Sequence, residues 1–429
     1  MKKLFALLLL LALLLSLGAC TALKDVEGTE TLPENNESSP VEQPAESEPL
    51  PPEMDTEHEA LGSQVIVSLK KNQEIFKAPD GTDQTILTFS YDTTTVHIEG
   101  RDAASERINT SLGVLEEKYY SGNGMGDGVG ELFEQATDNY AVAMELKDDR
   151  PLEFTSSRSA TVRRSDSRIL SIVYEIQVYS GGMHGIYHER AHVFDTQTGG
   201  RLLFSELCDT PDQTEALKEH MLGKMVEQAK AENSGVDLSR YEDDDALKTA
   251  LSALIRDTTW YLDESGLTVF SDVYELGSYA DGIIRFSFSY EDICEYLSSK
   301  WLPTPRVGDG SFSVAYVSDL PEGSAKILGR VEVDPDGEEI CLSADGTLYD
   351  VTVVSVDYVS GDFYETAQHW VCSYLYDCAV QLAATLPEGM PNVMIRYTSA
   401  DGTEHHLLIT QSGEDGSLVL TDDSIEAVG

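Results

Sequence analysis

The chain has 429 residues, of which 41% are hydrophobic, so it has enough apolar material for more than one folded core. Its 76 acidic side chains outnumber the 29 basic ones, and the formal net charge is -47. Because nucleic-acid binding draws on clustered Lys and Arg, this balance argues against a nucleic-acid partner. The acid excess favours either a cationic partner or simply a soluble surface.

The N-terminus has the pattern of a secretory signal. Lys2 and Lys3 precede an apolar run from Leu4 to Leu17, which is short for a membrane-spanning helix. The run ends in Leu17-Gly18-Ala19-Cys20, which resembles the lipobox of bacterial lipoproteins. The resemblance implies a signal peptide over residues 1–19, removed by cleavage, and lipid attachment at Cys20 through acyl chains such as palmitate. The alternative is an ordinary secreted protein in which Cys20 is incidental.

Residues 20–61 form a predicted tether. Between residues 21 and 60 there are twelve acidic side chains and six prolines, against the single basic residue Lys24. Such a segment cannot bury enough apolar surface to offset its ordering entropy, so we expect an extended, disordered linker. With the lipid anchor, it predicts a folded part held on the extracytoplasmic face of the cell membrane.

The first folded domain is predicted over residues 62–302. Residues 64–69 and 85–91 have the β-branched and aromatic content of strands, with a turn signal at residues 79–81 between them. Residue 102 begins a helical pattern, and a second helix is expected over residues 131–146. The glycine-rich segment 122–130 between the helices lacks the flanking strand and lysine of a phosphate-binding loop, so it is interpreted as a loop.

A long strand is predicted over residues 167–179, after a shorter one at 161–164. Leu170, Ile172 and Tyr174 alternate with residues of the opposite face, and both faces carry apolar side chains. This pattern predicts a central position on a core. Gly181, Gly182 and Gly185 then supply a turn, and residues 186–194 return as the second strand of a hairpin.

The spacing of the histidines in this hairpin suggests a metal site. His184, His188 and His192 are spaced four residues apart, which on a helix would place them on one face. In a strand the same spacing spans ~13 Å, too far for side chains that must converge on one zinc ion. We therefore interpret His184 as a turn residue and His188 and His192 as exposed strand positions, and expect no metal and no cofactor. The cysteines form no C-x-x-C pair either.

Several motifs of this region resemble one family. They are Ile169-Leu-Ser-Ile-Val-Tyr-Glu175, Gly181-Gly-Met-His-Gly185, Phe194-Asp-Thr-Gln-Thr-Gly199, Leu203-Phe-Ser-Glu-Leu207 and the segment 266–290. In this order they resemble the extracytoplasmic domain of lysozyme-sensing anti-sigma factors, which also precedes the catalytic part of some cell-wall polysaccharide deacetylases. The family often has Pro where this chain has Val273. The resemblance implies an α+β fold, with an antiparallel sheet packed on helices, and a role in binding rather than catalysis.

The second domain is predicted over residues 308–429, after Pro303 and Pro305. Short strands are expected at residues 312–317, 325–333, 340–343, 349–359, 392–398, 405–410 and 418–420, separated by Asp-Gly turns. This pattern predicts a smaller β-rich, sandwich-like domain. Residues 370–385 are compatible with one helix or with two further strands.

These observations favour a membrane-anchored binding lipoprotein whose ligand is cell-wall material, such as peptidoglycan, or a cationic protein such as lysozyme. The residues expected to bind are Met183, His184 and Tyr187 at the hairpin tip, followed by Tyr274 and Tyr279. We expect no enzyme, since no nucleophile or acid/base motif is found. The alternatives are a cell-wall polysaccharide-processing enzyme or accessory subunit, and a structural scaffold of the envelope.

Overall fold

The computed structural model describes residues 61–122, 128–147, 152–321, 323, 326–360, 362–413 and 415–422. The predicted signal peptide, the lipid-attachment residue Cys20 and nearly all of the predicted tether lie outside these ranges, as does the middle of the glycine-rich segment. Within the described ranges, no helix combines the length and the apolar character that a membrane span requires.

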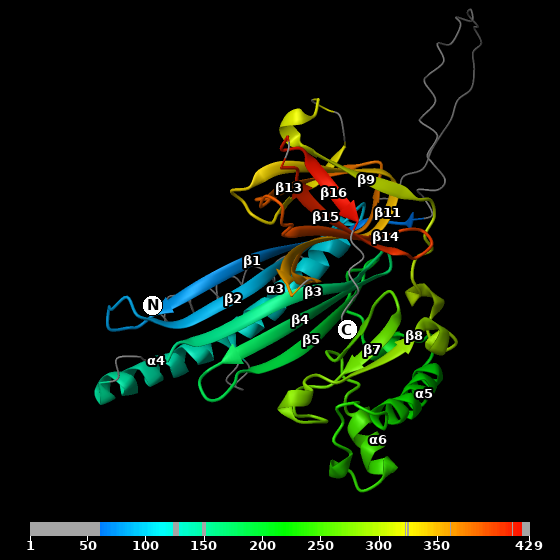
Figure 1. Cartoon of the computed structure of the whole chain (residues 1–429). Helices are drawn as coiled ribbons and strands as arrows, with labels where there is room; N and C mark the ends of the chain where they lie inside the picture. The colour runs from blue at the N-terminus through cyan, green and yellow to red at the C-terminus, as the bar shows by residue number, and fades with distance from the viewer. Residues whose placement is uncertain are drawn as a thin grey trace, which may run out of the picture. The chain divides into compact units, whose positions relative to one another are not determined.

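Thirteen strands of the described chain form one largely antiparallel sheet (Figure 1). Its N-terminal part runs in the order β1-β2-β3-β4-β5, in which only the β2–β3 pair is parallel. These strands are β1 (Val65–Lys77), β2 (Thr85–Ile98), β3 (Phe154–Ser165), β4 (Ile169–Tyr179) and β5 (Ile186–Asp195). Strand β4 lies between β3 and β5, which confirms the predicted central position.

Two helices cover one face of these strands (Figure 1). They are α3 (Asp102–Ser121) and α4 (Val129–Leu146). Helix α3 buries Ala104, Ile108 and Leu112, spaced four residues apart, against Leu170 and Ile172 of β4. The buried side chains of α4 pack instead on β2 and on the start of β3. Helix α3 therefore covers β4 only along its first half.

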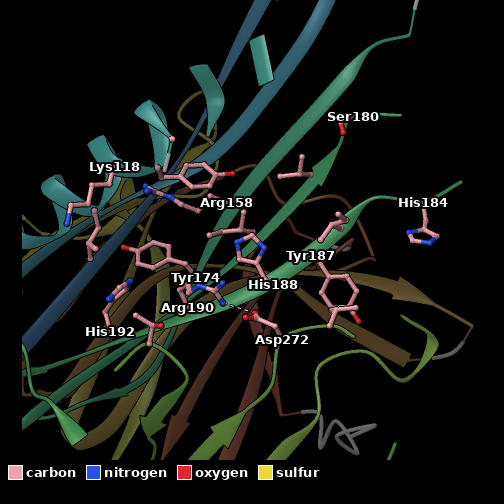
Figure 2. A pocket seen from close by; sticks show the side chains of 18 of the residues that line it. Lys118, Arg158, Tyr174, Ser180, His184, Tyr187, His188, Arg190, His192 and Asp272 are labelled. Carbon is pink, nitrogen blue, oxygen red and sulfur yellow. Dashed lines mark hydrogen bonds and ion pairs between the residues drawn. The ribbon is translucent and has the colours of Figure 1, made fainter. Parts of the chain in front are cut away.

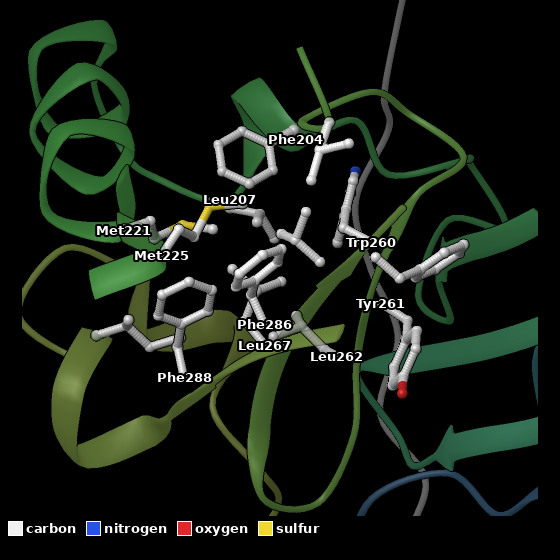
Figure 3. Packing of buried hydrophobic residues seen from close by; sticks show 14 of the residues in the cluster. Phe204, Leu207, Met221, Met225, Trp260, Tyr261, Leu262, Leu267, Phe286 and Phe288 are labelled. Carbon is white, nitrogen blue, oxygen red and sulfur yellow. The ribbon is translucent and has the colours of Figure 1, made fainter. Parts of the chain in front are cut away.

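The opposite face of β4 and β5 contributes to the largest hydrophobic core (Figure 3). Ile169 and Val173 meet side chains of α5 (Pro211–Ala229), α6 (Asp244–Ser252) and a small antiparallel sheet. That sheet has the order β6-β7-β8, formed by β6 (Trp260–Leu262), β7 (Gly266–Phe270) and β8 (Arg285–Ser289). The short helices α7 (Tyr290–Ile293) and η4 (Ser299–Trp301) end this region.

The remaining strands belong to the C-terminal region. They are β9 (Gly310–Tyr316), β10 (Ile327–Glu332), β11 (Glu338–Val359), β12 (Asp362–Tyr376), β13 (Ala379–Ala384), β14 (Val393–Thr398), β15 (Glu404–Gln411) and β16 (Leu418–Asp422). Strands β12 and β13 settle the open assignment of residues 370–385 in favour of strands. The two strands predicted at 340–343 and 349–359 are one strand, β11.

The sheet continues between the regions predicted as two domains. Ile66, Val67 and Ser68 of β1 pair with Cys372, Val371 and Trp370 of β12. The mixture of a large antiparallel-dominated sheet, a few helices and a second small sheet confirms the predicted α+β class. The predicted domain boundaries themselves stay a prediction.

Candidate functional site

A cavity of 720 Å³ lies where helix α3 ends and strands β4 and β5 continue. Leu115, Lys118 and Tyr119 of α3 form one wall. The facing wall consists of side chains that share one face of the β4–β5 hairpin, namely Tyr174, Ile176, Val178, Ile186, His188, Arg190 and His192. Arg158 of β3 and the loop residues Thr258, Asp272 and Val273 also line it, as do Gly122, Gln135, Ser180, Gly181, His184 and Tyr187. Its volume is in the range typical of sites for small ligands.

The ionisable side chains are unevenly placed along this cavity. Figure 2 shows Lys118, Arg158, Arg190 and His192 near Tyr174 at one end, and His184 and Tyr187 at the other. Lys118, Arg158 and Arg190 are cationic, whereas Asp272 is the one carboxylate among the lining residues. We call the end of the cavity that carries Lys118, Arg158, Arg190 and His192 its cationic end.

Arg158 is the most deeply placed of these cations. Its side chain is 6% exposed, and its guanidinium lies 5.0 Å from the ring centre of Tyr174 and 5.5 Å from that of Tyr119. It donates to the carbonyl oxygen of Asp92 over 3.3 Å and approaches the Glu116 carboxylate at 3.6 Å. Among the described residues, the buried Nε has no hydrogen-bond partner.

Arg190 is held in place by the loop after β7. Its Nη1 donates to a carboxylate oxygen of Asp272 over 2.7 Å, and Figure 2 shows this contact at the cavity wall. The other Asp272 oxygen lies 3.8 Å from Arg256, which also pairs with Glu275. The ion pairs therefore fix the loop carrying Val273 and Tyr274 against strand β5.

The structure corrects the interpretation of His192. The side chain is buried rather than exposed. The centre of its ring lies 5.9 Å from the centre of the Tyr174 ring, on the covered half of the hairpin face. Burial, together with the positive charges of Arg201, Arg158 and Arg190, lowers the pKa of His192 to about 3. The ring is therefore neutral at neutral pH. His188, also predicted as exposed, is half-buried.

Four of the five predicted binding residues come together beside the cavity. The ring of His184 stacks on that of Tyr279 with 3.9 Å between centroids, and Tyr187 meets Tyr279 edge-on at 5.9 Å. Tyr274 lies 5.8 Å from Tyr279. We call these four side chains the aromatic cluster. They come from the β4–β5 turn, from β5 and from the loop between β7 and β8.

The hydrogen bonds of His184 define its tautomer. Its Nδ1 donates to the carbonyl oxygen of Gly185 over 2.9 Å, which leaves Nε2 as an acceptor. The Tyr274 hydroxyl donates to this Nε2 over 3.5 Å. The contact joins the hairpin tip to the β7–β8 loop.

Tyr274 has an unusual backbone conformation. Its φ is +67°, in the left-handed region that bulky residues rarely occupy. Such strain persists only where the surroundings hold it, and it is concentrated at functional sites. The strained backbone at Tyr274 holds a half-exposed ring within the aromatic cluster.

Met183, the fifth predicted residue, stands apart from the cluster. It is fully exposed at the turn, where Gly181 and Gly182 have φ of +103° and +95° as the predicted turn requires.

The histidines do not assemble into a metal centre. Within the described part of the chain, no group of three or more His, Cys, Asp or Glu side chains could hold a metal ion. The five cysteines there, Cys208, Cys294, Cys341, Cys372 and Cys378, are free thiols.

The cationic end was absent from the sequence prediction. The hairpin register places His188 opposite Ile176 and Arg190 opposite Tyr174, so a tight turn alone would have predicted that they share a face. Arg158 and Asp272 carry no comparable signal, because they reach the cavity through the order of strands and through a loop.

Comparison with known proteins identifies one domain. Residues 210–291 match the family described as "Protein of unknown function (DUF3298)", so the chain contains a DUF3298 domain. This segment includes α5, the small sheet, Tyr274 and Tyr279.

Two solved structures of that family resemble the chain. A member from Bacteroides fragilis is 17% identical, with a TM-score of 0.40, and the match covers 55% of this chain and 94% of that one. A member from Pseudomonas aeruginosa is 13% identical, with a TM-score of 0.36 and coverage of 55% and 96%. No curated protein matches the chain.

Chemically, the site combines two kinds of contact. The aromatic cluster offers ring faces to a flat or ring-shaped apolar surface. The cationic end offers donors to an anion.

Proposed function

We propose that this protein is a membrane-anchored extracytoplasmic binding lipoprotein that captures cell-wall material. The observation that carries the proposal is the aromatic cluster beside a 720 Å³ cavity. Stacked rings provide a platform for the apolar faces of sugar rings, and they cost little conformational entropy because they are already held by one another. The resemblance to the extracytoplasmic domain of lysozyme-sensing anti-sigma factors implies a ligand that is either cell-wall material or a wall-attacking enzyme.

The supporting geometry is pre-formed. His184 and Tyr279 already stack, and the Arg190–Asp272 ion pair fixes the loop that carries Tyr274. A ligand would therefore meet an ordered surface, which lowers the entropic cost of binding.

A pull-down on insoluble peptidoglycan tests this proposal. The purified full-length protein in mild detergent is expected to co-sediment with peptidoglycan, and Tyr274→Ala should release a large part of it. Tyr358→Ala is the matched control, because Tyr358 of β11 has a similar exposure, 47% against 49%. Absence of co-sedimentation, or equal loss in both variants, would contradict the proposal.

A cationic protein such as lysozyme is the second candidate. The formal charge of -47 would speed the encounter with a basic partner and make it sensitive to salt. Immobilised lysozyme that retains the protein at low salt and after Tyr274→Ala would favour this candidate over the wall-binding one.

The proposal is for binding without turnover. Incubation of the protein with soluble peptidoglycan fragments should leave their masses unchanged, whereas cleaved or deacetylated products would establish the enzymatic alternative.

Membrane anchoring rests on Cys20 and is tested separately. Radiolabelled palmitate should enter the wild-type chain and not Cys20→Ser. Label that persists in the variant would exclude lipidation at this residue.

A further inference from the structure

The cavity lining has a positive net charge, whereas the whole chain has a negative one. The whole sequence has 76 acidic and 29 basic residues, whereas the ionised lining residues are Lys118, Arg158 and Arg190 against Asp272. His192 adds no charge at neutral pH, because burial lowers its pKa to about 3. A cavity with mostly one sign of charge and low-dielectric walls concentrates counter-ions of the opposite sign.

Arg158 makes few hydrogen bonds for a buried cation. A guanidinium has five N–H donors, yet among the described residues that of Arg158 makes a single hydrogen bond, to the carbonyl oxygen of Asp92. Its ion pair with Glu116 is long, at 3.6 Å, and the Glu116 side chain is 37% exposed. Burying a charge without full compensation is costly, so the arrangement is expected to be retained for a reason other than stability.

His192 adds a second unsatisfied group to the same end. Its side chain is 5% exposed, and its Nδ1 has no hydrogen-bond partner among the described residues. Two buried side chains that line one cavity and that each have one nitrogen without a hydrogen-bond partner among the described residues indicate a polar ligand group there.

Part of the remaining lining is apolar, beside the polar residues Gln135, Ser180, Thr258 and His188. The apolar part consists of Leu115 of α3 and of Ile176, Val178 and Ile186 on the hairpin, where Val178 pairs with Ile186. A fitting ligand therefore combines an anionic group with an apolar or ring-shaped body.

We propose that the cavity binds the carboxylate of a peptidoglycan fragment, with Arg158 and Lys118 at the anion and the aromatic cluster at the sugar. This inference rests on the proposed function and names the ligand chemistry. Peptidoglycan stem peptides carry carboxylates and are attached to a sugar ring, so one fragment carries both features. A basic protein would meet mostly positive charge inside the cavity, since Asp272 is the one carboxylate in its lining.

Calorimetric titration of the full-length protein in mild detergent tests this assignment with three probes. They are a disaccharide-peptide fragment with free carboxylates, the same fragment with its carboxylates amidated, and N-acetylphenylalanine as a carboxylate unrelated to the wall. Amidation is expected to weaken binding about tenfold or more, the usual value of a hydrogen bond to a charged group.

Substitutions of the cavity residues test where the carboxylate of the fragment binds. Arg158→Gln is expected to weaken the free fragment about tenfold or more, and Lys118→Gln severalfold. Lys118 is exposed, so its variant should fold even where Arg158→Gln does not. Arg163→Gln is the matched control, since Arg163 lies on the same strand, is exposed and does not line the cavity.

The outcomes separate the two proposals. If both forms of the fragment bind equally and Lys118→Gln has no effect, wall binding stands and the cavity assignment fails. If only N-acetylphenylalanine binds, and Lys118→Gln weakens it, the carboxylate chemistry stands and the wall-binding function fails. If no probe binds, both fail.

Discussion

The core beneath α5 and the cavity beside α3 lie on opposite faces of the same two strands, and they use large side chains in opposite ways. In the core, Met221, Trp260 and Phe286 are almost completely buried. At the hairpin tip, Met183 is fully exposed, while Arg158 is buried at the cavity, and its Nε has no hydrogen-bond partner in the described part of the chain.

This contrast indicates which face stabilises the fold and which face is available to a ligand. Apolar groups are buried and polar groups paired where only stability is needed. Among the described residues, the cavity departs from the pairing rule at Arg158 Nε and the hairpin tip departs from the burial rule at Met183, and such departures are expected at functional sites. The core departs from the pairing rule at one atom as well, the Nε1 of Trp260. Substitutions in the core should therefore act on stability, and those around the cavity mainly on binding.

The largest expected effect is in the core. Phe286→Ala should lower the free energy of unfolding by about 3–5 kcal/mol, because it leaves a large space among well-packed side chains. Urea denaturation followed by tryptophan fluorescence measures it. A loss below about 1 kcal/mol would mean that this face is not the main stabilising core.

The next effect concerns pH. The folded protein keeps His192 neutral down to a pKa of about 3, whereas the unfolded chain takes up a proton below about 6.5. Stability is therefore lost as the pH falls from about 6.5 toward 3, and the loss amounts to about 2 kcal/mol by pH 5.

His192→Gln should remove this component. Between pH 7 and pH 5, the unfolding free energy of the variant should fall by about 2 kcal/mol less than that of the wild type. Parallel pH profiles for the two proteins would show that the buried ring is protonated in the fold.

A smaller effect is expected at Tyr274. Tyr274→Asn should raise the free energy of unfolding by about 1 kcal/mol, because Asn tolerates the left-handed conformation better than Tyr. The same variant should weaken binding to peptidoglycan. Thermal unfolding and co-sedimentation give the two readouts, and reduced stability without a change in binding would contradict the assignment.

The smallest effect on stability is expected at Met183. Its side chain is fully exposed, so Met183→Ala should change the free energy of unfolding by less than about 0.5 kcal/mol. Any loss of peptidoglycan binding in this variant would then report a direct contact. A large destabilisation would be incompatible with the exposed turn.

Part of this arrangement was predictable from the sequence. The alternation around Leu170 and Ile172 fixed the central strand, and the glycines fixed the hairpin turn, because both depend on local geometry. Tyr274 and Tyr279 lie in the segment 266–290, which carries part of the family resemblance, and only the structure shows that they meet His184.

The cationic end and the burial of His192 were not predictable in the same way. Arg158 reaches the cavity because β3 lies beside β4, and Asp272 because its loop contacts β5. His192 is buried beside Tyr174, which strand periodicity alone does not indicate. These features depend on contacts between distant segments.

Hydrogen exchange tests the central claim most directly. Amide exchange of the full-length protein, followed by mass spectrometry, can be compared with and without a soluble peptidoglycan fragment. We expect slower exchange in residues 172–192 and 270–282, which carry the cavity wall and the aromatic cluster. Unchanged exchange there, or protection confined to the C-terminal strands β14 and β15, would contradict it.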